Sequence, residues 1–149
     1  MLERYLMQEK YSNKNYKEVV QGYIHFATSP SDSTYLIGSK CELCGYVAFP
    51  KRSVCPNCVK GDTMKEIPLS GKGKLHSFSI AHIAPPGLTA PYIVAWVNLD
   101  EGPRIFSQII GCEADEKALQ IGQRLEFVVD KISIDEKGNE LIGYKFRPI

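Results

Sequence analysis

The sequence predicts a mostly β protein with three parts: an N-terminal helix, a small ribbon that closes around a metal ion, and a five-stranded barrel. Three observations support this prediction. Residues 16–24 carry an apolar stripe with helical spacing, and two Cys-x-x-Cys pairs follow at residues 41–44 and 55–58. From residue 70 onward, strand patterns alternate with turn sequences. We expect the three parts to occupy residues 1–33, 34–69 and 70–149.

Composition and charge exclude several classes of protein. The chain has 149 residues, 44% of them hydrophobic and 23% charged, which is typical of a soluble globular protein. The net charge of +1 provides no global field that would attract a polyanion. No apolar run approaches the roughly 18 to 20 residues that span a membrane. Residues 1–10 carry charges and no apolar secretion signal, so we expect a cytoplasmic protein.

The first part is expected to be helical. Five apolar residues fall at i, i+3, i+4, i+7 and i+8, and together they form one face of a helix: Tyr16, Val19, Val20, Tyr23 and Ile24. This face could pack on the rest of the chain or on a partner protein, and the sequence leaves both interpretations open.

The four cysteines of the second part predict a metal site. Cys41, Cys44, Cys55 and Cys58 form two pairs with ten residues between them, long enough for a hairpin that brings the pairs face to face. Four thiolates around one point suit Zn²⁺ in a closed structural site. Disulfides are the alternative, but a cytosolic chain keeps its thiols reduced. We therefore predict one structural zinc ion per chain, with iron in a rubredoxin-like site as the rival.

Short strands are expected to frame this site. Residues 34–38 lead into the first pair, residues 46–49 form one arm of the hairpin, and residues 64–68 form a further strand. Lys51 and Arg52 stand at the hairpin tip. So small a unit cannot bury a sufficient core, and the metal would supply the missing folding energy.

The third part begins after Gly71 and Gly73, and it reads as five strands with a short helix at 113–119 between the third and the fourth. The predicted strands are residues 74–83, 92–99, 104–110, 124–134 and 140–146. This order matches an OB-type barrel, and a plain antiparallel sandwich is the competing architecture. The second strand is almost wholly apolar, so we expect it to be buried on both faces.

The sequence contains no recognisable catalytic set. His25, His76 and His82 have no adjacent carboxylate and no nucleophile at a known spacing, although His76 and His82 would share a strand face if the alternation were unbroken. Cys112 is the unpaired fifth cysteine. We expect it to be a small buried apolar residue, and a reactive thiol is the alternative.

A nucleic-acid interface is one alternative, because OB barrels bind single-stranded nucleic acids on their second and third strands. Those strands contain Tyr92, Trp96 and Phe106, but Arg104 is their one basic residue and the turn between them is acidic. A phosphate backbone needs a basic track. A single-stranded nucleic-acid binding module therefore remains an alternative that the sequence does not favour.

The order of motifs resembles a known family. The chain presents, in order, Cys41-x-x-Cys44-Gly45, Phe49-Pro50-Lys51-Arg52, Cys55-Pro56-x-Cys58, Gly71-Lys72-Gly73-Lys74 and the run from Pro91 to Arg104. This order is similar to that of OB-fold proteins with a rubredoxin-like zinc ribbon that accompany thiolases and related acyl-CoA enzymes. The sequence departs from the family pattern at Val59, where a glycine is frequent.

The resemblance implies an accessory subunit without catalytic residues of its own. It would form a hetero-oligomer with a thiolase-fold protein, bridge subunits and help to bind acyl-CoA. The CoA phosphates need a local basic cluster, and the available side chains are Lys51, Arg52, Lys72 and Lys74, each of which could equally be an ordinary surface charge. The pantetheine arm could follow an apolar groove between ribbon and barrel, with residues 84–91 as a loop over it.

Overall fold

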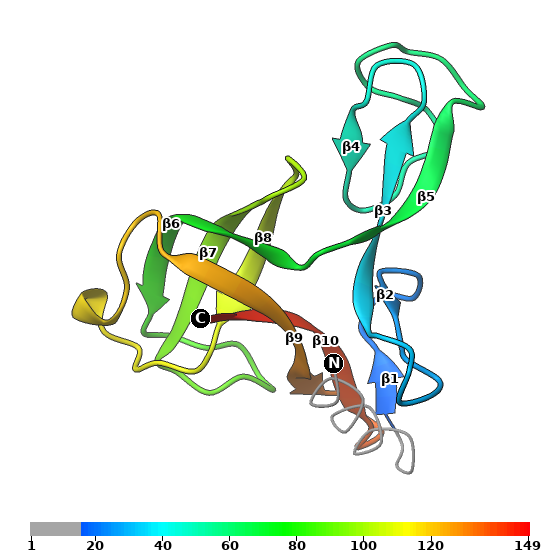
Figure 1. Cartoon of the computed structure of the whole chain (residues 1–149). Coiled ribbons are helices and arrows are strands. Elements are labelled where there is room, and N and C mark those ends of the chain that lie inside the picture. The colour runs from blue at the N-terminus through cyan, green and yellow to red at the C-terminus, as the bar shows by residue number, and fades with distance from the viewer. Residues whose placement is uncertain (1–15) are drawn as a thin grey trace.

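The computed structural model describes residues 16–149, which form two β-sheets (Figure 1). The smaller sheet belongs to the ribbon, and its central strand pairs antiparallel with each of the other three. Its strands are β2 (Ile24–His25), β3 (Tyr35–Cys41), β4 (Val47–Ala48) and β5 (Met64–Leu69), with β3 at the centre. This ribbon extends away from the larger sheet.

The larger sheet closes into a five-stranded barrel. Its strands are β6 (Lys72–Ala81), β7 (Tyr92–Leu99), β8 (Arg104–Ile109), β9 (Arg124–Ile134) and β10 (Glu140–Pro148). Hydrogen bonding runs in the order β9-β6-β7-β8-β10 and returns from β10 to β9. The closing contact is narrow and parallel: Phe146 pairs with Ile109, and the N–H of Ile110 donates to the Phe146 carbonyl at 2.9 Å. The barrel is confirmed, and the sandwich alternative is wrong.

The short helix expected between the third and fourth barrel strands is a single 3₁₀ turn, η1 (Glu116–Ala118). Asp115 caps it, because its carboxylate accepts a hydrogen bond from the Lys117 N–H at 2.9 Å. Within residues 16–149 there is no α-helix, and no helix there is long and apolar enough to cross a membrane.

The helix predicted at Tyr16–Ile24 is wrong. The segment begins as strand β1 (Tyr16–Glu18), which pairs parallel with β10, and the Val19 N–H donates to the Ile142 carbonyl at 2.8 Å. Gly22 then turns the chain with a φ of 85°. The first half of β10 has an edge that β8 leaves open, and pairing with that edge outweighs the local helical pattern. The rest of the predicted N-terminal part, residues 1–15, lies outside the described residues.

Aromatic packing joins the ribbon to the barrel. The Phe49 ring meets the Tyr23 and Tyr144 rings edge-on, with centroids 5.4 and 5.6 Å apart. In addition to this aromatic contact, Leu36 and Leu69 of the ribbon sheet lie in the same buried cluster as the barrel core. Such aromatic pairs contribute about 0.5–1.5 kcal/mol each beyond the area they bury, so the joint fixes the ribbon's direction.

One expectation about strand faces is also wrong, and the condition attached to another is not met. β7 was expected to be buried on both faces, but its residues alternate between buried and outward, and the outward Trp96 is 44% exposed. A barrel covers only the inner face of its strands. In β6, a register shift between Leu75 and Ser77 breaks the alternation, and the strand ends before His82. His76 and His82 therefore do not lie on one regular strand face.

Gly73 is a glycine for steric reasons. It lies in β6, which pairs with β7 on one side and with β9 on the other. A Cβ atom at this position would lie 2.3 Å from the Asn98 carbonyl oxygen of β7. A backbone oxygen inside a ladder cannot move without opening the barrel.

We expect Gly73→Ala to lower the free energy of unfolding in urea by about 3 kcal/mol, because the added methyl overpacks two backbones. Gly61→Ala is the matched control, since a Cβ there has no heavy atom within 4 Å. It should change stability by less than about 0.5 kcal/mol. Equal effects of the two substitutions would contradict this steric explanation.

Val59 occupies a backbone conformation that suits glycine. Gly45 follows the first cysteine pair with a φ of 80°, and Val59 follows the second pair with a φ of 56°. A β-branched residue in the left-handed region is strained. The departure from the family pattern at Val59 thus carries an energetic cost.

Val59→Gly should therefore stabilise the ribbon by about 1 kcal/mol, after allowance for the greater freedom of glycine in the unfolded chain. Amide hydrogen exchange at residues 55–59 should slow about 5-fold. Val54→Gly is the control, because Val54 is also exposed but is not among the described residues with positive φ. Exchange should become faster in that control, and a slowing in both variants would argue against strain at Val59.

Candidate metal centre

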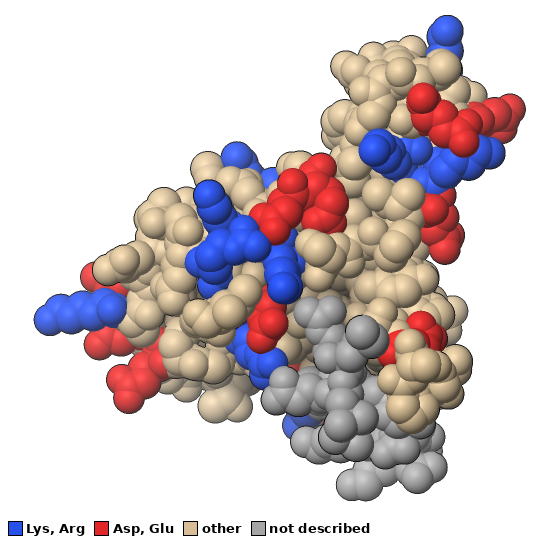
Figure 2. Space-filling view, in the orientation of Figure 1, with Lys and Arg blue, Asp and Glu red and all other residues tan. Residues whose placement is uncertain are grey.

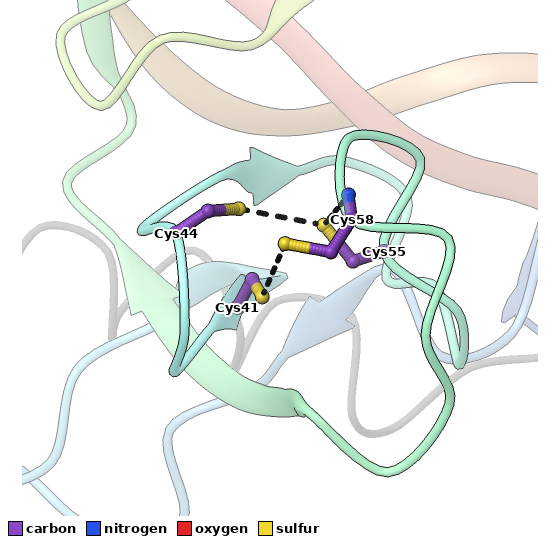
Figure 3. Close-up of side chains that lie close together, drawn as sticks. All are labelled: Cys41, Cys44, Cys55 and Cys58. Carbon is purple, nitrogen blue, oxygen red and sulfur yellow. Dashed lines mark hydrogen bonds between the residues drawn. The ribbon is translucent and has the colours of Figure 1, made fainter.

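The four cysteines predicted as metal ligands come together at the far end of the ribbon (Figure 3). Cys41 ends β3 and Cys44 lies in the turn that follows, whereas Cys55 and Cys58 belong to the second turn. Their sulfur atoms point toward one another, and all four lie within 4.8 Å of each other. The two-pair spacing therefore correctly predicted one shared centre.

Backbone hydrogen bonds build the two turns in the same way. The Gly45 N–H donates to the Cys41 carbonyl at 2.9 Å, and the Val59 N–H donates to the Cys55 carbonyl at 2.8 Å. The Cys58 N–H also donates to the Cys55 sulfur at 3.3 Å. Donors that point at sulfur stabilise a thiolate and orient it toward the centre of the cluster.

The sulfur spacing fits a tetrahedral ion. Cys41 and Cys58 have sulfurs 4.0 Å apart, and Cys44 and Cys55 have sulfurs 3.6 Å apart. A disulfide needs about 2.05 Å, so all four cysteines are free. A tetrahedral site with metal–sulfur bonds of about 2.3 Å has sulfur–sulfur edges of about 3.8 Å. The four cysteines are thus positioned for metal binding.

Electrostatics also favours a cation here. The Thr63 hydroxyl lies 3.4 Å from the Cys41 sulfur, and its hydrogen bond is the main cause that lowers the pKa of Cys41 to about 6. The neighbouring sulfurs, Cys44 first, raise the pKa of Cys58 to about 12. Crowded thiols therefore resist full deprotonation by themselves. A divalent cation removes this conflict because four thiolates can share its charge.

The four basic residues proposed for CoA phosphates lie in two groups. Lys51 and Arg52 are on the ribbon, where the Lys51 ammonium pairs with the Glu66 carboxylate at 2.9 Å. Lys72 and Lys74 lie on β6 of the barrel. Figure 2 shows lysine and arginine side chains in one group on the barrel and another on the ribbon, with acidic side chains and uncharged surface between them. The structure does not bring all four residues together.

An apolar pocket of about 350 Å³ lies between residues 19–24 and the outer face of the barrel. Its lining includes Val19, Val20, Tyr23, Leu88, Val94 and Phe106. A groove was expected between ribbon and barrel beneath residues 84–91. Leu88 does come from that loop, but the opposite wall is the segment after β1. The sequence analysis did not predict this wall, because it predicts a helix for residues 19–24.

The surroundings of His25 and Cys112, which lie outside the four-cysteine cluster, favour a structural role for both residues. His25 Nε2 lies 3.0 Å from an Asp32 carboxylate oxygen, a partner that sequence adjacency did not reveal. The same oxygen of Asp32 accepts a hydrogen bond from the Thr28 N–H, so the pair ties the loop before β3 together. Cys112 is partly buried against the core, and burial raises the pKa of its thiol, which disfavours the reactive thiolate.

Comparison with known proteins gives consistent results along the chain. Residues 33–64 match the family described as the rubredoxin-like zinc ribbon domain of ChsH2, and residues 66–130 match its C-terminal OB-fold domain. A DUF35 domain-containing scaffold protein of Methanocaldococcus jannaschii is 36% identical over 149 residues, which cover 98% of this chain and 96% of the relative.

Two further matches are named as parts of enzymes, one a thiolase subunit and the other an aldolase. The benzoylsuccinyl-CoA thiolase subunit BbsA of Thauera aromatica is 37% identical over 123 residues, covering 81% of this chain and 83% of the relative. The solved structure of an Ltp2-ChsH2(DUF35) aldolase has a TM-score of 0.60 at 30% identity, covering 76% of this chain and 84% of that one. The resemblance stated from the sequence is confirmed: the chain belongs to the DUF35 family, whose members join a rubredoxin-like zinc ribbon to an OB-fold domain.

Proposed function

We propose that this protein is a non-catalytic accessory subunit of a thiolase-type acyl-CoA enzyme complex, in which it bridges subunits and helps to bind the acyl-CoA. One observation carries the proposal: over 81% of its length the chain resembles a protein named as a subunit of benzoylsuccinyl-CoA thiolase. The reacting cysteine and histidine of such a complex would belong to the thiolase-fold partner.

One zinc ion per chain is part of this proposal, and Cys41, Cys44, Cys55 and Cys58 would hold it. When bound, zinc supplies cross-links that stabilise a ribbon with little core of its own. All four ligands come from protein side chains, which leaves no open position for substrate. The role of the metal would therefore be structural rather than catalytic.

The shape of the ribbon supports a bridging role. The ribbon stands away from the barrel (Figure 1), and it exposes the apolar side chains of Leu43, Val54 and Val59. Large apolar side chains exposed on a projecting element favour a protein contact. The aromatic joint at Phe49 would keep this contact surface in a fixed direction relative to the barrel.

The pocket supports a role in acyl-CoA binding. Its volume of about 350 Å³ is within the range of small-molecule sites, and its lining is mainly apolar. This environment suits the acyl chain or the pantetheine arm rather than the phosphates. Lys72 and Lys74 on the barrel, and Lys51 and Arg52 on the ribbon, remain the proposed phosphate contacts.

The decisive experiment is co-expression with a thiolase-fold protein from the same host, followed by affinity purification and size-exclusion chromatography. We expect one stable hetero-oligomer that binds a CoA ester in calorimetry. If the partner elutes separately and no CoA ester binds to either preparation, the proposal is wrong.

Cys58→Ser should remove zinc and weaken the complex, because three thiolates cannot close the site. Metal analysis should give one zinc and no iron per wild-type chain, and much less than one zinc for the variant. Its ribbon amides should exchange faster while those of β6–β10 stay protected. Cys112→Ser is the control, since Cys112 is not part of the four-sulfur cluster. A fully loaded Cys58→Ser protein would contradict the assignment.

A further inference from the structure

Two aromatic side chains lie uncovered on the outer face of the barrel. Trp96 of β7 and Phe106 of β8 are directly paired across the strands, and they are 44% and 49% exposed. Their ring centroids are 5.2 Å apart and their planes are tilted by 59°. Because the rings are not stacked flat on each other, each keeps a face available for another ring.

A row of basic side chains runs beside this pair. Along the outer face, neighbouring strands place Arg124 beside Lys74, Lys74 beside Asn98, and Asn98 beside Arg104. Asn98 and Arg104 are each two residues along their strands from the aromatic pair, which puts them on the same face. The row therefore adjoins the aromatic pair across four strands of the barrel.

The Asn98 amide orients Arg104, which lies at one end of the row. Its oxygen accepts a hydrogen bond from the Arg104 Nε at 2.7 Å, and its nitrogen lies 3.3 Å from His76 Nδ1. The terminal nitrogens of Arg104 have no hydrogen-bond partner within residues 16–149. Arg104 is thus oriented by Asn98 while the outer part of its guanidinium remains free to bind an anion.

The row carries more positive than negative charge. Asp100 forms a two-point ion pair with Arg124, at 2.7 and 2.8 Å. Within the described chain, no carboxylate lies within ion-pair distance of Lys74 or Arg104. Asp100 already balances the charge of Arg124. The charges of Lys74 and Arg104 are therefore the ones available to an added anion such as a phosphate.

We propose that this face binds the phosphorylated adenosine end of coenzyme A. The purine would stack on Trp96 and Phe106, and the phosphates would be bound by Arg104 and Lys74. This assignment rests on the acyl-CoA role proposed above, and it adds three residues to the CoA contacts expected from the sequence: Trp96, Phe106 and Arg104.

The chemistry favours a nucleotide over a protein partner at this face. Aromatic rings beside arginine and lysine are how OB barrels hold bases and phosphates on the same two strands. A long nucleic-acid strand needs a basic track of several phosphates, but the turn between β7 and β8 carries Asp100 and Glu101. A compact ligand with a single cluster of phosphates suits a short basic row.

The protein's single tryptophan makes this proposal directly measurable, because Trp96 fluorescence reports from the site itself. We expect saturable quenching when CoA or adenosine 3′,5′-bisphosphate is added to the full chain, and none with 4′-phosphopantetheine. The double variant Lys74→Gln with Arg104→Gln should weaken CoA binding at least ten-fold, and Phe106→Leu should weaken it several-fold in calorimetry. Lys60→Gln with Lys65→Gln removes the same charge from the ribbon and should bind CoA like the wild type.

The same titrations are run on the complex with the thiolase partner. If CoA binds the complex equally well in the Lys74/Arg104 variant and in the wild type, the nucleotide site lies elsewhere, and the accessory role proposed above still stands. A ten-nucleotide oligothymidine that binds the free chain more tightly than CoA would also overturn the proposal. Absence of quenching in both the free chain and the complex would have the same consequence.

Discussion

The close approach of four cysteine sulfurs is the constraint on which the ribbon depends. Contacts with the neighbouring sulfurs, Cys44 first, together with burial raise the pKa of Cys58 to about 12, and a cation lets all four thiols be charged together. The strands around them are short, so little buried apolar area is available to replace that cation. Folding of the ribbon and binding of the proposed ion would therefore be one process.

A ribbon stabilised in this way is useful only if its direction is fixed. The Phe49 ring, held between Tyr23 and Tyr144, links the chain just after β4 to the barrel. Leu36 and Leu69 extend the barrel core into the ribbon sheet. A cross-link at one end and an aromatic joint at the other would make the ribbon a rigid arm, which is what a bridging subunit requires.

Sequence patterns correctly predicted those elements whose structure is determined by residues close together in the chain. The strands at 92–99 and 124–134 have the predicted bounds because apolar β-formers are followed by turn residues. The metal centre was predictable because cysteine spacing alone restricts its geometry. Residues 16–24 were mispredicted because an edge of β10, more than a hundred residues away in sequence, decides their structure. Their helical spacing was a local signal that a distant contact outweighed.

The outer face of the barrel illustrates why sites are harder to predict than strands. An apolar run such as β7 shows that a strand exists, but it does not show whether a second layer covers it. Among residues 16–149 no second layer covers Trp96, and the basic side chains beside it come from β6, β8 and β9. In the sequence these cations are dispersed in a chain of net charge +1, which argued against a polyanion such as nucleic acid. Barrel closure gathers them into one row, so the local charge at a site can differ in kind from the charge of the whole chain.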